Sequence, residues 1–202
     1  MLALHRLALL SMLLTVLLMP VDGIGILADL PLVKLTGLLT FGFVTVLIMS
    51  GAEIRGVFWF VALSLFYVCW TVLSFLWTLM PVDYQHAQAI NSQQSIKAHL
   101  YLHGLVLLIF QVIRRESDLQ WLLLAFLLGS FVLVGIFLST YDPGATTVRH
   151  SLEELDANEM SVQLAMALPA AFYLLSMSQH WWIRVLAVVY LPLAVLSILA
   201  TG

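Results

Sequence analysis

The chain has 202 residues, of which 62% are hydrophobic and only 9% are charged, with a formal net charge of −3. Soluble domains usually have about a quarter of their residues charged, so this composition excludes an ordinary soluble fold. Eight scattered Lys and Arg residues form no basic patch for nucleic acid, and the single cysteine excludes a disulfide framework.

Seven long apolar segments, separated by short polar joints, run along the chain. A bilayer core about 30 Å thick needs roughly 20 apolar residues in a helix that crosses it. We therefore predict an all-α, polytopic membrane helix bundle of about seven transmembrane helices in one domain, 1–202. The segments lie at about Leu2–Met19, Leu32–Met49, Val57–Leu79, His99–Ile113, Leu119–Thr140, Met160–Met177 and Ile183–Thr201. The fourth is short, and we expect it to extend outward through 95–98.

Basic residues are divided unevenly between the joints. The N-terminus and the joints after the second, fourth and sixth segments carry five of them, and the alternate joints carry three: Lys34, Lys97 and Arg149. Because cytoplasmic joints carry the excess of Lys and Arg, the N-terminus is expected in the cytoplasm. The outer joints then hold eight of the eleven acidic residues. The last segment ends without a polar tail, so we expect the chain to be the N-terminal part of a larger protein.

Several spans contain residues typical of close or bent helix packing. Gly129-Ser130 and the i, i+4 pair Ala167 and Ala171 offer small faces at which helices can approach. Pro169 and Pro192 are expected to kink the sixth and seventh spans, with the freed backbone groups satisfied by neighbours. Tryptophans near span ends, Trp121 and Trp182 among them, fit the level of the lipid headgroups.

The joint before the sixth span has a recognisable helix-start pattern. Asp156 and Glu159 have capping-box spacing. A purely structural interpretation makes Asp156 the N-cap and Asn158 a solvated residue of the first turn. The alternative is an anion site, because a helix N-terminus presents free N–H groups that favour phosphate. Arg149 could then add a bidentate contact to a phosphate or diphosphate, although the nearby acidic residues would repel the same anion.

The polar stretch before the fourth segment offers weaker candidates. Lys97, with Gln93 and Gln94, could contact sugar hydroxyls or a lipid phosphate, but a solvated helix face explains these residues as well. His99 and His103 have the i, i+4 spacing of a helical metal pair. No third ligand lies close in sequence, so we interpret them as interfacial or helix-packing histidines and predict no metal site.

The residues from 149 onward resemble the O-antigen ligase and polymerase family. The similar features are Arg149, then Asp156-Ala157-Asn158-Glu159, then an Ala- and Leu-rich helix broken at Pro169 with Tyr173 beyond. The span layout is similar along all 202 residues, and the specific part lies within 149–173. Two further stretches are similar to parts of the family: Leu73–Trp77 with Pro81 and Asp83, and Ile198–Gly202.

The resemblance implies a glycosyltransferase of the bacterial inner (plasma) membrane that acts on the periplasmic face. It implies transfer of a glycan from an undecaprenyl-diphosphate carrier, to a lipid A-core sugar in a ligase or to another repeat unit in a polymerase. It implies no cofactor, neither metal nor nucleotide. The candidate diphosphate or glycan contacts are Arg149, Asp156, Asn158 and Lys97. No residue of this chain is assigned a catalytic role, because the family places further arginines and a histidine in a later periplasmic loop, so the chain alone is expected to be inactive.

Two other classes of function stay open. One is a polysaccharide-lipid transporter or flippase subunit, and the other is a non-catalytic membrane scaffold of envelope biogenesis. No predicted span carries a central carboxylate or lysine, which disfavours an ion-coupled transporter. The residues do not distinguish a ligase from a polymerase.

Overall fold

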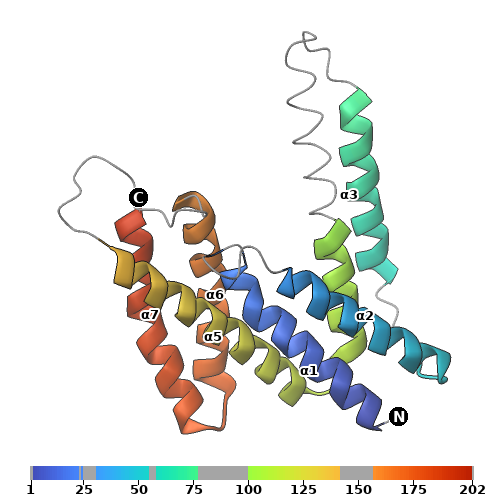
Figure 1. Cartoon of the computed structure of the whole chain (residues 1–202), viewed down its shortest axis with the longest axis horizontal. Coiled ribbons are helices and arrows are strands. Elements are labelled where there is room, and N and C mark those ends of the chain that lie inside the picture. The colour runs from blue at the N-terminus through green and yellow to red at the C-terminus, as the bar shows by residue number, and fades with distance from the viewer. Residues whose placement is uncertain are drawn as a thin grey trace. The chain divides into compact units, whose positions relative to one another are not determined.

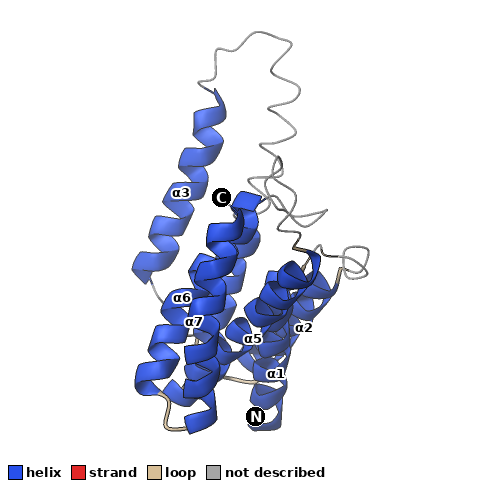
Figure 2. Ribbon diagram, turned by 90° about the vertical axis from the view of Figure 1, so that its left-hand side faces the viewer, coloured by secondary structure: helices blue, strands red, loops and turns tan. Residues whose placement is uncertain are grey.

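The computed structural model describes residues 2–22, 24, 31–54, 58–76, 100–141 and 157–201, and every regular element among them is a helix (Figures 1 and 2). The all-α prediction is confirmed for these residues. In chain order the elements are α1 (Leu2–Leu18), the short 3₁₀-helix η1 (Met19–Val21), α2 (Leu32–Met49), α3 (Phe58–Leu76), the unlabelled helix Leu100–Val112, α5 (Glu116–Thr140), α6 (Ala157–Met177) and α7 (Trp181–Thr201).

Five of these helices are long and apolar enough to cross a membrane: α1 with η1, α2, α5, α6 and α7. This composition and length fit a multi-pass helical membrane protein. The helix α3 adds 19 residues without a charge. The helix Leu100–Val112 spans about 20 Å at 1.5 Å per residue, and its expected extension through 95–98 lies outside the described residues.

Contacts divide the chain into two compact units. Unit 1 contains Met1–Phe43 and Ile113–Gly202, and therefore α1, η1, the first part of α2, and α5 to α7. Unit 2 contains Val44–Val112, and therefore the end of α2, α3 and the helix Leu100–Val112. Unit 1 is discontinuous in sequence, because the whole of unit 2 is inserted between its two parts.

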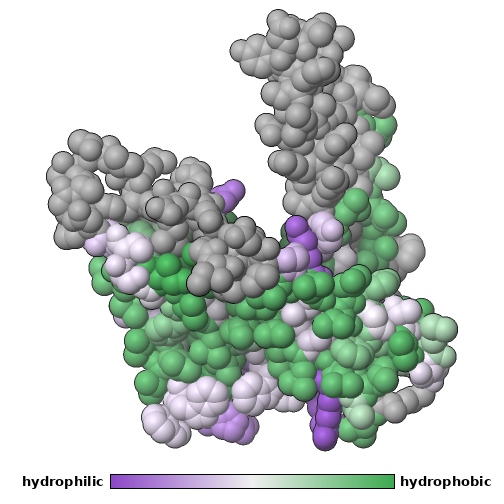
Figure 3. All heavy atoms as spheres, in the orientation of Figure 1, coloured by the Kyte–Doolittle hydropathy of each residue, from purple (hydrophilic) through white to green (hydrophobic). Residues whose placement is uncertain are grey.

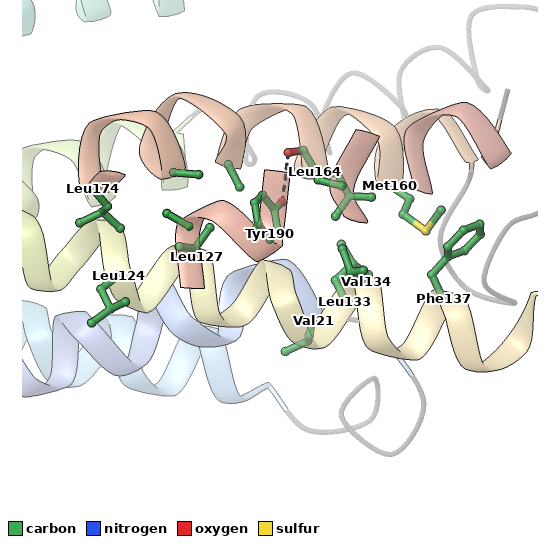
Figure 4. Packing of buried hydrophobic residues seen from close by; sticks show 14 of the residues in the cluster. Val21, Leu124, Leu127, Leu133, Val134, Phe137, Met160, Leu164, Leu174 and Tyr190 are labelled. Carbon is green, nitrogen blue, oxygen red and sulfur yellow. Dashed lines mark hydrogen bonds between the residues drawn. The ribbon is translucent and has the colours of Figure 1, made fainter. Parts of the chain in front are cut away.

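The centre of unit 1 is the packing of α5 against the antiparallel pair α6 and α7, with α1 and η1 on α5 as well. The buried residues of α6 recur every three or four positions, from Met160 through Leu164 to Leu174, which is the spacing of one helix face. On α7, Tyr190 is fully buried and its hydroxyl points to α6 (Figure 4). Ala167 and Ala171 are also fully buried in this core, as their spacing predicts.

The packing of α5 on the end of α1 depends on a glycine. A β-carbon added at Gly129 would collide with the carbonyl oxygen of Leu17 and lie 3.0 Å from Cδ of Pro20. A backbone oxygen cannot move aside as a flexible side chain can, so this approach requires glycine. The adjacent Ser130 is fully buried, and its hydroxyl donates to the Phe126 carbonyl at 2.9 Å within the same helix. The predicted close approach at Gly129-Ser130 is confirmed.

Hydroxyl groups join α1 to the first part of α2. Thr40 Oγ1 lies 3.0 Å from Ser11 Oγ, and Ser11 in turn donates to the carbonyl of Ala8 at 3.0 Å. Thr40 Oγ1 also lies 2.9 Å from the carbonyl oxygen of Thr36, so each of the two hydroxyls has both a carbonyl of its own helix and the other hydroxyl within hydrogen-bond distance. Both side chains are buried, where a hydroxyl without a partner would be costly.

In unit 2, α2 ends in a glycine-dependent cap. Gly51 has φ +88°, in the left-handed region. The N–H of Gly51 donates to Ile48 at 2.9 Å and that of Ala52 to Leu47 at 3.0 Å, which is the paired pattern of a Schellman motif. The cap satisfies two of the carbonyls that a helix end would otherwise leave unpaired.

The helices α6 and α7 continue through Pro169 and Pro192, both of which are exposed. Pro169 has no N–H to donate to the carbonyl of Ala165. One residue earlier, the Leu164 carbonyl accepts a hydrogen bond from the Tyr190 hydroxyl at 3.2 Å. The neighbouring helix α7 therefore supplies a hydrogen-bond donor next to the carbonyl of Ala165, which receives no N–H from Pro169.

Candidate functional site

Most of the predicted diphosphate site lies outside the described residues. This applies to Arg149, Asp156 and Lys97, and for Asn158 only the backbone is described. That backbone lies in the first turn of α6, which begins at Ala157, directly after Asp156. Asp156 therefore occupies the sequence position of an N-cap, and the exposed Glu159 follows three residues later, as capping-box spacing requires.

Two buried polar atoms near this helix start have no partner among the described residues: Oε1 of Gln163 and Oγ of Ser197. Gln163 lies six residues after Ala157, or about 9 Å along α6. The bond between Tyr190 and the Leu164 carbonyl sets the register of the α6–α7 pair. Since the helices are antiparallel, Ser197, two turns beyond Tyr190, lies toward the start of α6. Both unpaired atoms therefore lie toward this end of unit 1.

An unpaired buried hydroxyl or amide oxygen costs about 1–3 kcal/mol, so both atoms are places where water or a ligand hydroxyl would be favourable. The sequence marks Gln163 as an unusual polar residue within a span. Ser197 is not singled out by composition. Its only signal is its place in the stripe Ala187, Tyr190, Ala194 and Ser197 on the buried face of α7.

At the opposite end of unit 1, Asp118 caps the start of α5. The backbone N–H groups of Arg114 and Arg115 both donate to Oδ2 of Asp118, each at 3.0 Å. Asp118 is only 8% exposed, while both arginine side chains are exposed. Asp118 and Glu116 also place negative charge in the first turn, where the helix dipole favours it. One carboxylate thus fixes the backbone that carries two arginines.

The joint between α6 and α7 lies at this same end. Nε of Arg184 donates to the Ser178 carbonyl at 2.7 Å, and the backbone N–H of His180 donates to the Ser178 hydroxyl at 3.3 Å. The hydroxyl of Tyr173, near the end of α6, donates to Glu116 at the start of α5 at 3.3 Å. These bonds bring the starts of α5 and α7 together around the end of α6.

We call this region the basic end, defined by Arg114, Arg115 and Arg184. The start of α1, the helix that contains Arg6, lies toward the same end of unit 1, whereas the start of α2, the helix that contains Lys34, lies toward the other end (Figures 1 and 2). Hydrophilic atoms gather along the lower edge of this unit in Figure 3, below a broadly hydrophobic face. The alternation of basic joints read from the sequence thus agrees with the helix directions in unit 1.

The histidine pair of the fourth segment is only partly described. His99 lies outside the described residues. The ring of His103 stacks on Tyr67 of α3, with ring centroids 6.4 Å apart and planes 25° apart, both within unit 2. This contact supports the helix-packing interpretation of His103. Among the described residues, no group of three or more His, Cys, Asp or Glu is placed to hold a metal ion.

Unit 1 therefore has polar features at both ends: the unpaired atoms of Gln163 and Ser197 toward the start of α6, and the arginines of the basic end. Similarity assigns a ligand to neither feature. No protein-family model, no curated protein and no solved structure matches this chain.

Proposed function

We propose that the chain belongs to a bacterial inner-membrane glycan transferase of the O-antigen ligase or polymerase type. Its donor would be an undecaprenyl-diphosphate-linked glycan on the periplasmic face, and its acceptor a lipid A-core sugar or another glycan. The proposal is supported by the resemblance within 149–173. The structural observation that carries it furthest is that α6 begins at Ala157, with Asp156 before it and Asn158 in its first turn.

A helix start of this kind suits the leaving group of the reaction. In the transfer, the bond between the sugar C1 and the diphosphate oxygen breaks, and the diphosphate leaves with the electron pair. The acceptor hydroxyl oxygen bonds to C1 and loses its proton to a base. Free N–H groups of the first turn, together with Arg149, would stabilise the charge that develops on the diphosphate. The unpaired Oε1 of Gln163 supports a polar ligand or water at this end.

The proposal includes a topology of seven spans with a cytoplasmic N-terminus. Five spans are the long apolar helices described above, and α3 and the helix Leu100–Val112 would be the other two. The arginines near the starts of α1, α5 and α7 would then face the cytoplasm. The joint 141–156, which connects α5 to the adjacent α6, would face the periplasm.

This topology can be tested with reporter fusions. A fusion at Gly144 should give an active periplasmic phosphatase and a dark fluorescent protein. A fusion at Arg114 should give the reverse. The same side for both fusions would contradict the seven-span arrangement, and exchanged sides would contradict the orientation.

The described helices favour a transferase over an ion-coupled transporter. The Asp, Glu, Lys and Arg residues of these helices all lie within about one turn of a helix start, for example Lys34, Glu159 and Arg184. A coupling ion or proton usually requires a central ionisable group within the spans. A flippase subunit or scaffold does not require one, so these remain the outcomes to which a negative transferase test would point.

The direct test replaces Arg149 in the complete protein in its own cell, scored by glycan attachment and glycan chain length on gels. Arg149→Ala should lower product by about tenfold or more, because a cation on the leaving group is removed. Arg149→Lys should retain part of the activity. Lys34→Ala, which removes another cation predicted on the same side, should leave product unchanged. Normal product from Arg149→Ala at normal expression would overturn the proposed role.

A second variant separates the structural interpretation from the site. Asp156→Ala should destabilise the protein by about 1 kcal/mol if Asp156 is an N-cap. A loss of stability in Asp156→Ala, together with normal product in Arg149→Ala, would leave the helix start with a purely structural role.

A further inference from the structure

The fold orients the side chain of one arginine of the basic end and fixes the backbone of the other two. Arg184 is oriented by the 2.7 Å bond from its Nε to the Ser178 carbonyl. That bond uses one of the five guanidinium N–H groups, so four remain on the terminal nitrogens. Arg114 and Arg115 are fixed through their backbone by Asp118, and their side chains are exposed. The hydrogen bond between Tyr173 and Glu116 joins the end of α6, just before Arg184, to the start of α5, just after Arg114 and Arg115.

The local charge favours an anion. Three arginines and two carboxylates lie at the basic end, and both carboxylates already accept hydrogen bonds: Asp118 from two backbone N–H groups and Glu116 from the Tyr173 hydroxyl. The starts of α5 and α7 add partial positive charge at the same end. A guanidinium group binds phosphate through two parallel hydrogen bonds.

The surface beside these arginines is suited to a lipid rather than to a free anion. The rings of Trp121 and Trp182 lie 6.4 Å apart across the starts of α5 and α7, and both are exposed. Paired tryptophans of this kind prefer the headgroup level of a bilayer. Farther along α7, Val185, Val188 and Val189 are exposed, so acyl chains attached to a phosphate at the basic end would meet an apolar face.

We propose that the basic end is a binding site for the phosphate of an anionic phospholipid, with Arg114, Arg115 and Arg184 as its phosphate ligands and the Trp121–Trp182 pair at the glycerol level. This site is separate from the joint 141–156 and does not rest on the proposed transferase function. Its ligand is a membrane lipid of the leaflet that surrounds the starts of α5 and α7.

The test measures lipid binding to the purified full chain in an uncharged detergent. Dioleoyl-phosphatidylglycerol is titrated in and the bound lipid is counted by native mass spectrometry, with dioleoyl-phosphatidylcholine, whose phosphate is balanced by the choline cation, as the comparison without net charge. The wild type should bind phosphatidylglycerol more tightly. Each of Arg114→Gln, Arg115→Gln and Arg184→Gln should weaken that binding by about fivefold, which corresponds to one basic residue near a lipid surface. Lys34→Gln, which removes the same charge elsewhere in unit 1, should leave it unchanged.

Arg184→Lys distinguishes a shaped site from charge alone. It keeps the charge but loses the bidentate fork and the Nε bond, so its affinity should fall between wild type and Arg184→Gln. If Arg184→Gln aggregates, lipid binding by Arg114→Gln and Arg115→Gln tests the proposal. These two substitutions should not disturb folding, because the hydrogen bonds described for Arg114 and Arg115 are made by their backbone. Equal binding of the two lipids, or an equal loss in Lys34→Gln, would overturn the proposal. Displacement of the lipid by millimolar inorganic phosphate would show a free-anion site and would also overturn it.

Discussion

Gly129 of α5 lies so close to the end of α1 that a β-carbon there would collide with the carbonyl oxygen of Leu17. The same helix contains a natural comparison. A β-carbon at Gly135 would meet no heavy atom within 4 Å other than the adjacent backbone of its own helix. Two identical substitutions in one helix therefore separate the steric requirement of a helix contact from the general effect of glycine in a helix.

We predict that Gly129→Ala lowers the free energy of unfolding by about 1–3 kcal/mol, because α1 or α5 must shift to admit the methyl group. Gly135→Ala should be neutral or stabilising by up to about 1 kcal/mol, because alanine has the higher helix propensity. Both can be measured by thermal unfolding in detergent micelles. Equal stability of the two variants would contradict the close approach.

The hydrogen bond between Thr40 and Ser11 should contribute measurably to the packing of α1 on α2. Thr40→Val should destabilise the protein, and the coupling energy with Ser11→Ala in a double-mutant cycle should be about 0.6 kcal/mol and no more than about 1.7. Thr36→Val is the control, because the Thr36 hydroxyl bonds only to carbonyls of its own helix. Coupling of similar size between Thr36 and Ser11 would argue against a specific bond.

The Tyr190 hydroxyl should stabilise the α6–α7 pair. Tyr190→Phe should cost about 1 kcal/mol, because it removes a buried donor and leaves the Leu164 carbonyl without that partner. Tyr173→Phe removes an exposed hydroxyl bonded to Glu116 and should cost much less. The two variants make the same chemical change at a buried and at an exposed hydroxyl. An equal loss of stability at both positions would show that burial does not determine the contribution of the Tyr190 hydroxyl.

Asp118 should hold the start of α5. Asp118→Ala should cost about 1 kcal/mol, as the loss of a helix cap usually does, and should speed amide hydrogen exchange at Arg114 and Arg115. Glu116→Ala, which removes an exposed carboxylate from the same turn, should leave those two amides unchanged. Unchanged exchange in Asp118→Ala would show that its two hydrogen bonds do not protect the turn.

The sequence is sufficient to locate most helices because each is a long apolar run with a marked boundary. For α2 the predicted and observed bounds are both Leu32–Met49, since Pro31 precedes the run and Gly51 caps its end. For α5 the prediction starts at Leu119 but the helix begins at Glu116. Hydrophobicity places the start at the first apolar residue, whereas the helix includes a polar first turn that Asp118 caps.

Features that depend on how two helices align cannot be predicted from the apolar runs of the sequence. The collision point at Gly129 is suggested by a small residue, but its partner on α1 is not. Likewise, Ser197 becomes notable only once the bond from Tyr190 sets the register of α6 and α7. The predicted contacts Arg149, Asp156 and Lys97 lie outside the described residues and stay predictions.

The insertion of unit 2 within unit 1 has a consequence for the order in which the protein is made. The helix α1 is synthesised first, yet its contact with Gly129 forms only after about a hundred further residues have left the ribosome. Until then the buried face of α1, with Ser11 and Met12, must be held by lipid, by the insertion machinery or by α2 alone. Contacts so distant in sequence form late. The slow step of biogenesis should therefore be the capture of α1 by α5, and a substitution at Gly129 should lower the yield of inserted protein more than its effect on final stability suggests.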